Sequence, residues 1–199
     1  FDKDTVFRLG NQTGLSNATI DTYISRFLKS KEIIRLKSKL YVSADFFNKN
    51  RDDISYPFYL ANVIRKPSYV SSWAALQYYN LTTEAIHSVT SVTLKGTITY
   101  ETKVGNFSYR SIRTELFSGF TLVRGKPAPY GAIGSRSGFD FFMASPSKAL
   151  FDLLYFRTRQ LRGLSREEID RMIEALRIDF DEMNRSEQET FYAMIKKYE

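Results

Sequence analysis

The sequence predicts an α+β fold in two parts: a winged helix-turn-helix over residues 1–50, and an α+β domain over residues 57–199 with an antiparallel sheet and closing amphipathic helices. Three patterns predict it. Apolar residues recur at helical spacing near the N-terminus, β-branched and aromatic residues form short runs in the middle, and capping signals precede the last helices. With 199 residues, 43% of them hydrophobic, the chain can bury a substantial core.

The N-terminal part begins with a helix-turn-helix pattern. Residues 1–13 carry apolar side chains suited to a first helix, and residues 14–16 favour a tight turn. Ser16 is a good N-cap for a second helix, because its hydroxyl can accept a hydrogen bond from an unpaired backbone N–H. The apolar positions of that helix share one face: Ile20, Ile24, Phe27 and Leu28.

The opposite face of the second helix carries small, polar or cationic side chains, namely Ala18, Thr22, Ser25, Arg26 and Lys29. A helix that enters a DNA major groove needs such a face. Two apolar-rich runs, residues 32–36 and 39–43, are joined at a basic tip and predict the hairpin of a wing. The alternative is an ordinary helix packed on an ordinary hairpin, with lysines that face solvent.

If this part binds double-stranded DNA, its polar side chains can be divided into candidates for base contacts and candidates for phosphate contacts. Asn17, Thr19 and Thr22 are candidates for hydrogen bonds to base edges. The candidates for phosphate contacts are Arg26, Lys29, Lys37, Lys39, and Ser16 together with the helix N-terminus. Arg35 either contacts phosphate or pairs with Glu32. Secondary DNA contacts are expected from Arg110, Arg113, Arg124 and Lys126.

The charge distribution also favours a polyanionic partner. The net charge of +7 divides into +3 for residues 1–56, +8 for residues 57–163 and −4 for residues 164–199. A basic body with an acidic tail is typical of proteins that bind nucleic acid. Charge that only keeps the protein in solution is the alternative.

The rest of the chain predicts a connector, a mixed middle and closing helices. Residues 44–56 are polar and favour a connector. Helices are expected at residues 56–64 and 71–80, the latter capped by Ser71 or Ser72, and strands at residues 67–71, 88–94, 97–103, 107–112, 121–125, 130–134 and 139–145. The closing helices have N-cap signals at Ser145, at the capping box of Ser165 and Glu168, and at a second box of Ser186 and Glu189.

The composition excludes several kinds of chemistry. The chain has no cysteine, which rules out disulfides, thiolate metal ligands and cysteine nucleophiles, and its one histidine, His87, argues against most histidine-based sites. It has no apolar run of about 18 residues and no signal-peptide pattern, so no membrane span is expected. The expectation is a cytoplasmic protein without a cofactor and without catalytic residues.

Three weak catalytic patterns have simpler interpretations. Ser145 and Lys148 fit the S-x-x-K spacing of penicillin-recognising enzymes, but the companion motifs are missing. Glu101 and Lys103 resemble half of a metal-dependent nuclease site, for which only Glu84 or Glu115 is nearby as a second acidic ligand, and a charge pair that faces solvent is the simpler interpretation. The glycines at 131, 134 and 138 lack the lysine of a phosphate-binding loop, although Arg136 could assist there.

Two further segments carry a resemblance to a known family. The first contains Tyr69-Val70-Ser71, Ala75-Leu76, Tyr79-Asn80-Leu81 and a threonine-rich run at residues 89–93; the second contains Ala144, Lys148, Ala149, Leu150, Asp152, Leu153 and Leu154. With the N-terminal pattern and the run Lys39 to Val42, these motifs resemble the AbiEi-type antitoxins of abortive infection, over most of residues 5–156. Asn80 stands where that family commonly has glycine, and the hairpin tip lacks a frequent glycine.

The resemblance implies the autorepressing antitoxin of a type IV toxin–antitoxin system. Such a protein binds inverted repeats in its own promoter through the winged helix, and it counters a nucleotidyltransferase-like toxin without a stable complex. The second domain is then required for antitoxicity. Two other function classes remain open from the residues alone: a protein-interaction module with a winged helix that does not bind DNA, and a metal-dependent nuclease.

Overall fold

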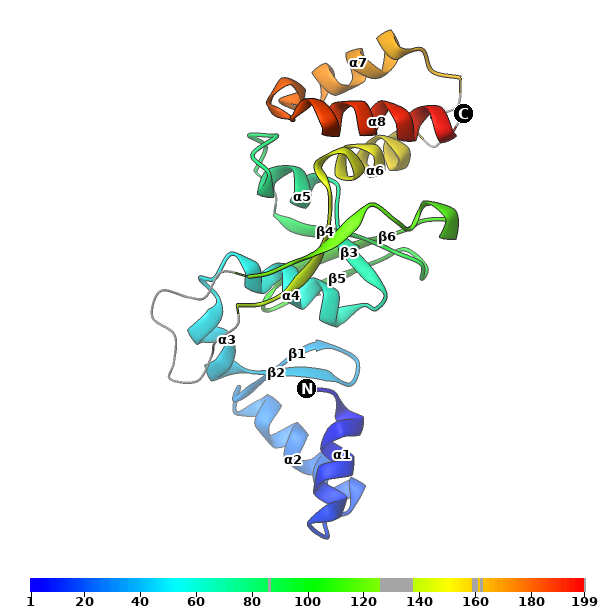
Figure 1. Cartoon of the computed structure of the whole chain (residues 1–199). Helices are drawn as coiled ribbons and strands as arrows, with labels where there is room; N and C mark the ends of the chain where they lie inside the picture. The colour runs from blue at the N-terminus through cyan, green and yellow to red at the C-terminus, as the bar shows by residue number, and fades with distance from the viewer. Residues whose placement is uncertain (86, 126–137, 159–160, 162, 199) are drawn as a thin grey trace.

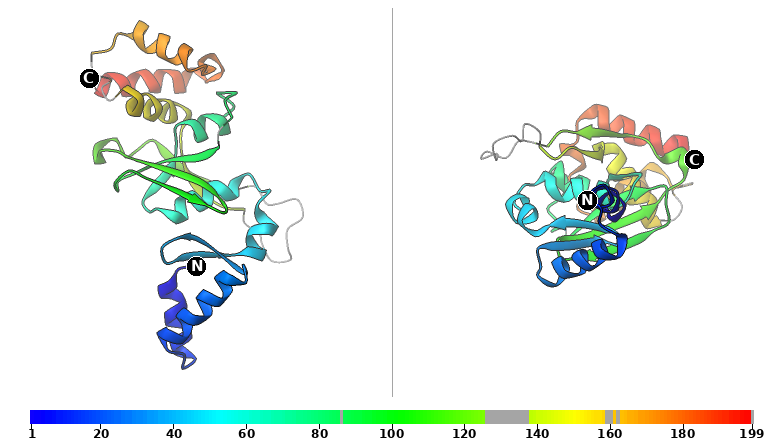
Figure 2. Two further views of the ribbon diagram at one scale, coloured as in Figure 1. Left: turned by 180° about the vertical axis from the view of Figure 1, so that it is seen from behind. Right: turned by 90° about the horizontal axis from the view of Figure 1, so that it is seen from below.

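The computed structural model describes residues 1–85, 87–125, 138–158, 161 and 163–198. The molecule is elongated (Figures 1 and 2): two helices and a hairpin form one end, a sheet lies in the middle, and helices form the other end. The first end, called the N-terminal module below, contains α1 (Lys3–Gln12), α2 (Asn17–Lys29), β1 (Ile33–Lys37) and β2 (Leu40–Ser43).

The N-terminal module confirms the predicted helix–turn–helix order. The turn after α1 contains Gly14 at a φ of 82°, a left-handed conformation that glycine adopts without steric cost. Ser16 is the N-cap of α2, since its Oγ accepts a hydrogen bond from the backbone N–H of Thr19 at 3.2 Å. Ile20, Ile24 and Tyr41 form a small buried cluster between the helices and the hairpin.

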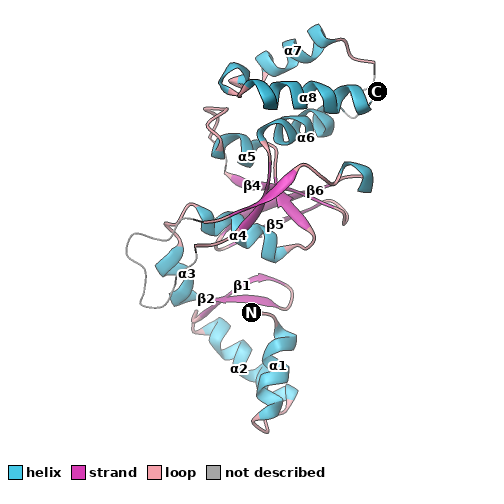
Figure 3. Ribbon diagram, in the orientation of Figure 1, coloured by secondary structure: helices cyan, strands magenta, loops and turns pink. Residues whose placement is uncertain are grey.

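The hairpin is buried on both faces. Tyr41 packs against the helices of the module, whereas Leu36, Leu40 and Val42 belong to the core of the rest of the molecule. The hairpin therefore lies between the helix pair and the sheet (Figure 3), and it joins the two parts through apolar contacts.

The predicted connector at residues 44–56 is wrong, because most of it is helical. Ser43 caps α3 (Ala44–Asn50) by accepting a hydrogen bond from the N–H of Phe46, and α4 (Ser55–Ile64) follows. Phe47 packs against the core while the polar residues of α3 face outward. A helix this short shows too few apolar positions for its period to be recognised in the sequence.

The sheet has six strands in the order β5-β6-β4-β3-β8-β7. Their bounds are β3 (Ser68–Val70), β4 (Ser88–Thr93), β5 (Ile98–Thr102), β6 (Gly105–Ser111), β7 (Phe120–Val123) and β8 (Phe141–Ala144). The sheet is mixed, not antiparallel as predicted, because β6 returns between β5 and β4 and pairs parallel with β4, and β8 pairs parallel with β3. The strand predicted at residues 130–134 lies outside the described residues.

Helices cover the two faces of the sheet. On one face lies α4, where Ala61 O accepts a hydrogen bond from the Tyr109 hydroxyl at 2.7 Å. On the other face lie α5 (Trp73–Tyr78) and α6 (Pro146–Thr158), followed by α7 (Arg166–Ala175) and α8 (Arg185–Tyr198) (Figure 1). Two short 3₁₀ helices, Thr114–Leu116 and Phe180–Glu182, complete the described elements.

The helix caps agree only partly with the prediction. The capping box of Ser165 and Glu168 at α7 is confirmed. At α5, neither predicted serine caps the helix, because the Thr90 hydroxyl on β4 accepts from the N–H of Ala74 at 3.0 Å. At α8, Asn184 Oδ1 accepts from the N–H of Glu187, so the cap lies two residues before the one predicted at Ser186.

Candidate nucleic-acid interface

The outward face of α2 lies at the end of the molecule farthest from the C-terminal helices (Figure 1). Five residues of this face are exposed and polar, small or cationic: Ala18, Thr22, Ser25, Arg26 and Lys29. Asn17 is also exposed, in the first turn, but on another side of the helix. Because α1, β1 and β2 take up the opposite face, the five side chains are free to meet a flat or grooved partner. Phe27, predicted to be buried, is 43% exposed on the flank of this face.

The hydroxyl groups near the N-terminus of α2 are partly engaged. The Ser16 Oγ lies 2.9 Å from the Thr19 Oγ1, and the Thr22 Oγ1 donates to Ala18 O at 3.0 Å. Ser16 and Thr19 thus serve the helix cap first. Thr22 keeps its acceptor lone pairs, and the side-chain amide of Asn17 makes no hydrogen bond within the described part of the chain. Asn17 and Thr22 are the candidates best placed to meet a base edge.

Arg26 and Lys29 are the free cations of α2. Within the described ranges, neither side chain bonds to a carboxylate or to any other side chain, in contrast to Lys3, whose ammonium pairs with Asp21 at 2.6 Å. Both lie in the last turn of α2, where the helix dipole also favours positive charge. Their position is therefore compatible with phosphate binding and with simple stabilisation of the helix end.

Lys37 does not have the expected role. The pairing of β1 with β2 shifts between Arg35 and Lys37, so that Lys37 pairs with Leu40 on the side that faces the sheet. There its ammonium donates a hydrogen bond to Ile64 O at the end of α4. Burial lowers the pKa of Lys37, and the nearby charges of Lys95 and Arg65 lower it further. The expectation of a phosphate contact from Lys37 is therefore wrong for this conformation.

Arg35 and Lys39 remain exposed on the hairpin. The Arg35 guanidinium lies 5.9 Å from the ring centre of Tyr41 and does not pair with Glu32, whose carboxylate accepts from the Ser30 hydroxyl. Lys39 has a φ of 61° at the tip, and its carbonyl accepts from the N–H of Lys3. The tip is thus held beside the start of α1.

The predicted secondary contacts do not extend the face of α2. On β6, Tyr109 points toward α4, so Arg110 points to the opposite side of the sheet, because side chains alternate along a strand. Arg113 lines a cavity with Lys148 and Lys197 on that same side. Arg124 is exposed after β7, and Lys126 lies outside the described residues.

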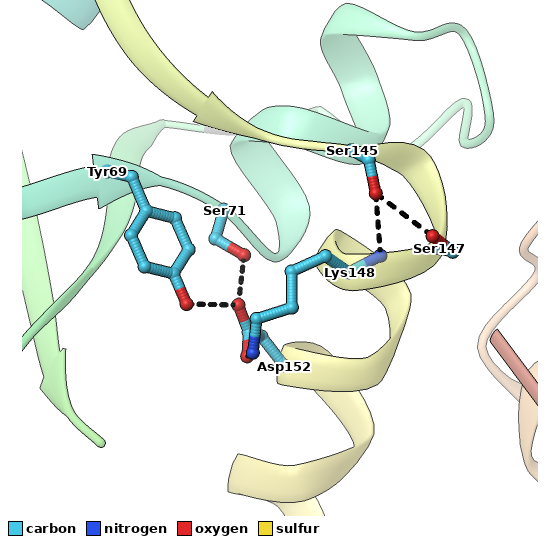
Figure 4. A network of polar contacts seen from close by, with 6 residues as sticks. All are labelled: Tyr69, Ser71, Ser145, Ser147, Lys148 and Asp152. Atoms are coloured by element: carbon cyan, nitrogen blue, oxygen red, sulfur yellow. Dashed lines mark hydrogen bonds and ion pairs between the residues drawn. The ribbon is translucent and has the colours of Figure 1, made fainter. Parts of the chain in front are cut away.

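The weak catalytic pattern at Ser145 belongs to a buried polar network (Figure 4). The Ser145 hydroxyl accepts from the N–H of Lys148 at 3.3 Å, as expected of a helix N-cap. The Lys148 ammonium lies 2.6 Å from Asp152, which also accepts hydrogen bonds from the hydroxyls of Tyr69 and Ser71. Lys148 is therefore an ion-pair partner of Asp152 and not a base for Ser145. Sequence reasoning missed this network, since its members lie up to 83 positions apart.

Among the residues that the structure describes, the fold brings no further catalytic or metal-binding side chains to the other two patterns. Glu101 and Lys103 are exposed at the edge strand β5 and the turn after it. Within the described residues, no three His, Cys, Asp or Glu side chains gather where they could hold a metal ion. The glycines at 131 and 134, with Arg136, lie outside those residues. His87 is exposed just before β4.

The chain matches no protein-family model and no curated protein sequence. Its resemblance to the AbiEi-type antitoxins therefore rests on the motifs themselves. Of the helices within the described ranges, none has the length and apolar character needed to cross a membrane.

Proposed function

We propose that this protein is a DNA-binding transcriptional regulator whose α2 enters the major groove of double-stranded DNA. The proposal is supported by the outward face of α2, on which Arg26 and Lys29 are exposed and unpaired within the described residues, and by Asn17, whose side chain is exposed in the first turn of the helix. A major groove accepts one helix, and an asparagine side chain can bond bidentately to adenine. Arginine and lysine neutralise the phosphates on either side.

The charges around α2 set the expected strength of the salt dependence. Of the exposed cations on the module, four are candidates for phosphate contacts: Arg26, Lys29, Arg35 and Lys39. If each neutralises one phosphate, log K falls with log salt at a slope of about −3.6. Lys37 is left out of this number because its ammonium bonds to Ile64 O.

Removing the free cations of α2 tests the proposal. The variant Arg26→Ala with Lys29→Ala should bind DNA from the protein's own promoter more weakly, and its salt slope should be smaller by about 2, as expected when two phosphate contacts are lost. Fluorescence anisotropy at several salt concentrations measures both quantities. The control is Lys103→Ala with Arg110→Ala, which removes the same charge from the sheet. Equal losses in the two variants would refute a specific role for α2.

We further propose that the regulator is the autorepressing antitoxin of a type IV system. The motif resemblance supports this, and so does Asn80, which stands where the family commonly has glycine and has a φ of 57°, a left-handed conformation that asparagine tolerates better than most residues. When it is co-expressed with a nucleotidyltransferase-like toxin of this class, the protein should restore growth, and the double variant of α2 should lose repression without losing this rescue. No rescue by the wild-type protein would overturn the antitoxin role.

A protein-interaction module is the second candidate, and exposed apolar side chains on the helix pair favour it. Leu9, Tyr23 and Phe27 are 55%, 42% and 43% exposed. Such groups are more typical of a protein interface than of a DNA contact. The discriminating variant is Arg26→Ala, Lys29→Ala and Lys39→Ala together: wild-type affinity for DNA after this change would favour the protein-interaction module.

A further inference from the structure

An apolar groove opens beside α4, away from the face of α2. It is bounded by α4 and by the hairpin of β7 and β8, and its volume is about 650 Å³. Most of its wall is aromatic or aliphatic, with contributions from Tyr59, Phe120, Leu122 and Phe142. This size and character fall in the range of small-molecule sites.

The groove arises from a gap in strand pairing. β3 and β8 pair only at Val70 and Met143, so the backbone N–H of Phe142 has no strand partner. The side chain of Asn62 on α4 takes that place, and its Oδ1 accepts the hydrogen bond from Phe142. Beyond this point the hairpin diverges from β3, and Leu122 and Phe142, which pair across β7 and β8, stay 53% and 43% exposed.

Asn62 supplies a polar group to the groove. The residue is only 9% exposed and lines the groove, and its Nδ2 has no hydrogen-bond partner among the described residues. A buried amide donor without a partner is unfavourable. An acceptor oxygen on a bound molecule would satisfy it, and Lys66 and Asp140 are the charged residues of the rim.

We propose that this groove binds a small, flat aromatic molecule that carries a carbonyl oxygen. The ring packs between Phe120, Leu122 and Phe142, and the carbonyl oxygen accepts a hydrogen bond from the Nδ2 of Asn62. An aromatic body matches the aromatic wall, and a single acceptor matches the single unpaired donor. The site is separate from the face of α2, because its lining residues come from α4, the sheet and the segments beside them, and none belongs to the N-terminal module.

The test uses 4-fluorobenzamide as the probe with the full chain in the absence of DNA. Fluorine NMR should show broadening of the probe signal, and the side-chain amide signals of Asn62 should shift. Leu122→Glu, which places a charge in the apolar wall, should weaken binding at least tenfold. Leu94→Glu is the matched control, since Leu94 is an exposed leucine at the end of β4, outside the groove.

A second variant separates the polar contact from the fold. Asn62→Asp keeps the oxygen that accepts from Phe142 and removes the amide donor, so it should weaken binding of the probe while the circular dichroism spectrum stays the same. If Asn62→Asp does not fold, Leu122→Glu still decides the matter. The proposal is overturned if the wild-type protein does not bind the probe at millimolar concentration, or if Leu122→Glu and Leu94→Glu bind it equally.

Discussion

At the scale of single residues, the fold depends on the buried polar network around Asp152. Lys148 and Asp152 are 2% and 0% exposed, and the two hydroxyls of Tyr69 and Ser71 complete the hydrogen bonds of the carboxylate. Removing one member of a buried ion pair leaves the other charge without compensation, at a cost of about 3–5 kcal/mol. Both charges belong to α6, so the contact with the sheet comes from the hydroxyls of Tyr69 and Ser71, which hold Asp152 against β3.

Replacing the members of this pair should give non-additive effects. Lys148→Met and Asp152→Leu should each lower the free energy of unfolding by several kcal/mol, and the double variant should lose less than the sum, because no charge then stays buried alone. Urea denaturation measures all three. Lys49→Met, at an exposed pair of the same spacing with Asp45, is the control and should change little. Additive losses would contradict the description of the network.

Tyr79 links stability to alkaline pH. Its hydroxyl donates to Ala144 O, and burial raises its pKa to about 12, above its ordinary value of 10. Below pH 10 both folded and unfolded states hold the proton, so the stability is fully present. Between pH 10 and about 12 the unfolded state loses its proton first, and the free energy of unfolding falls by up to about 1.4 kcal/mol per pH unit for this group.

Tyr79→Phe should make the alkaline fall of stability shallower. The measurement is urea denaturation at a series of pH values from 8 to 11 for the wild-type protein and the variant. The same slope in both proteins would show that the hydroxyl of Tyr79 is not protected by the fold.

At the scale of elements, the packing of α1 on α2 depends on one small residue. A Cβ added at Gly10 would lie 2.5 Å from the Cδ1 of Ile20, which is 3% exposed and has little room to move. Overpacking of this kind costs about 1–3 kcal/mol. Gly10 thus sets how closely the two helices approach.

Gly10→Ala should therefore destabilise the N-terminal module and weaken any function of α2. Denaturation should show an earlier loss of helical signal, and Gly96→Ala is the control because nothing lies within 4 Å of an added Cβ there. A Gly10→Ala variant with wild-type stability would mean that the helices can separate without cost.

Some features of the helices and strands could be predicted from neighbouring residues in the sequence, and others could not. The cap of α2 at Ser16 and the box at Ser165 were predictable, because both partners lie within one turn of helix. The cap of α5 could not be predicted, because it comes from Thr90 on β4, which is distant in the sequence. The parallel pairings of β6 and β8 and the inward turn of Lys37 likewise depend on contacts between distant segments.

At the scale of the whole molecule, the hairpin of β1 and β2 joins the N-terminal module to the sheet. Leu36 and Leu40 pack into the main core, and Lys37 bonds to the end of α4. The polar and cationic residues on the outward face of α2 could be predicted from the sequence. The packing of the β1–β2 hairpin against the sheet could not, because it depends on these contacts with distant segments. The groove beside α4 also depends on tertiary arrangement, since its residues come from segments far apart in the chain.

Recognition of DNA by α2 is tested by a mobility shift. The protein is titrated onto a duplex from its own upstream region and onto a scrambled duplex, at two salt concentrations. We expect tighter binding to the upstream duplex and weaker binding as salt rises. Equal binding to both duplexes would contradict sequence recognition by α2, and no binding at low salt would contradict the assignment of a DNA-binding module.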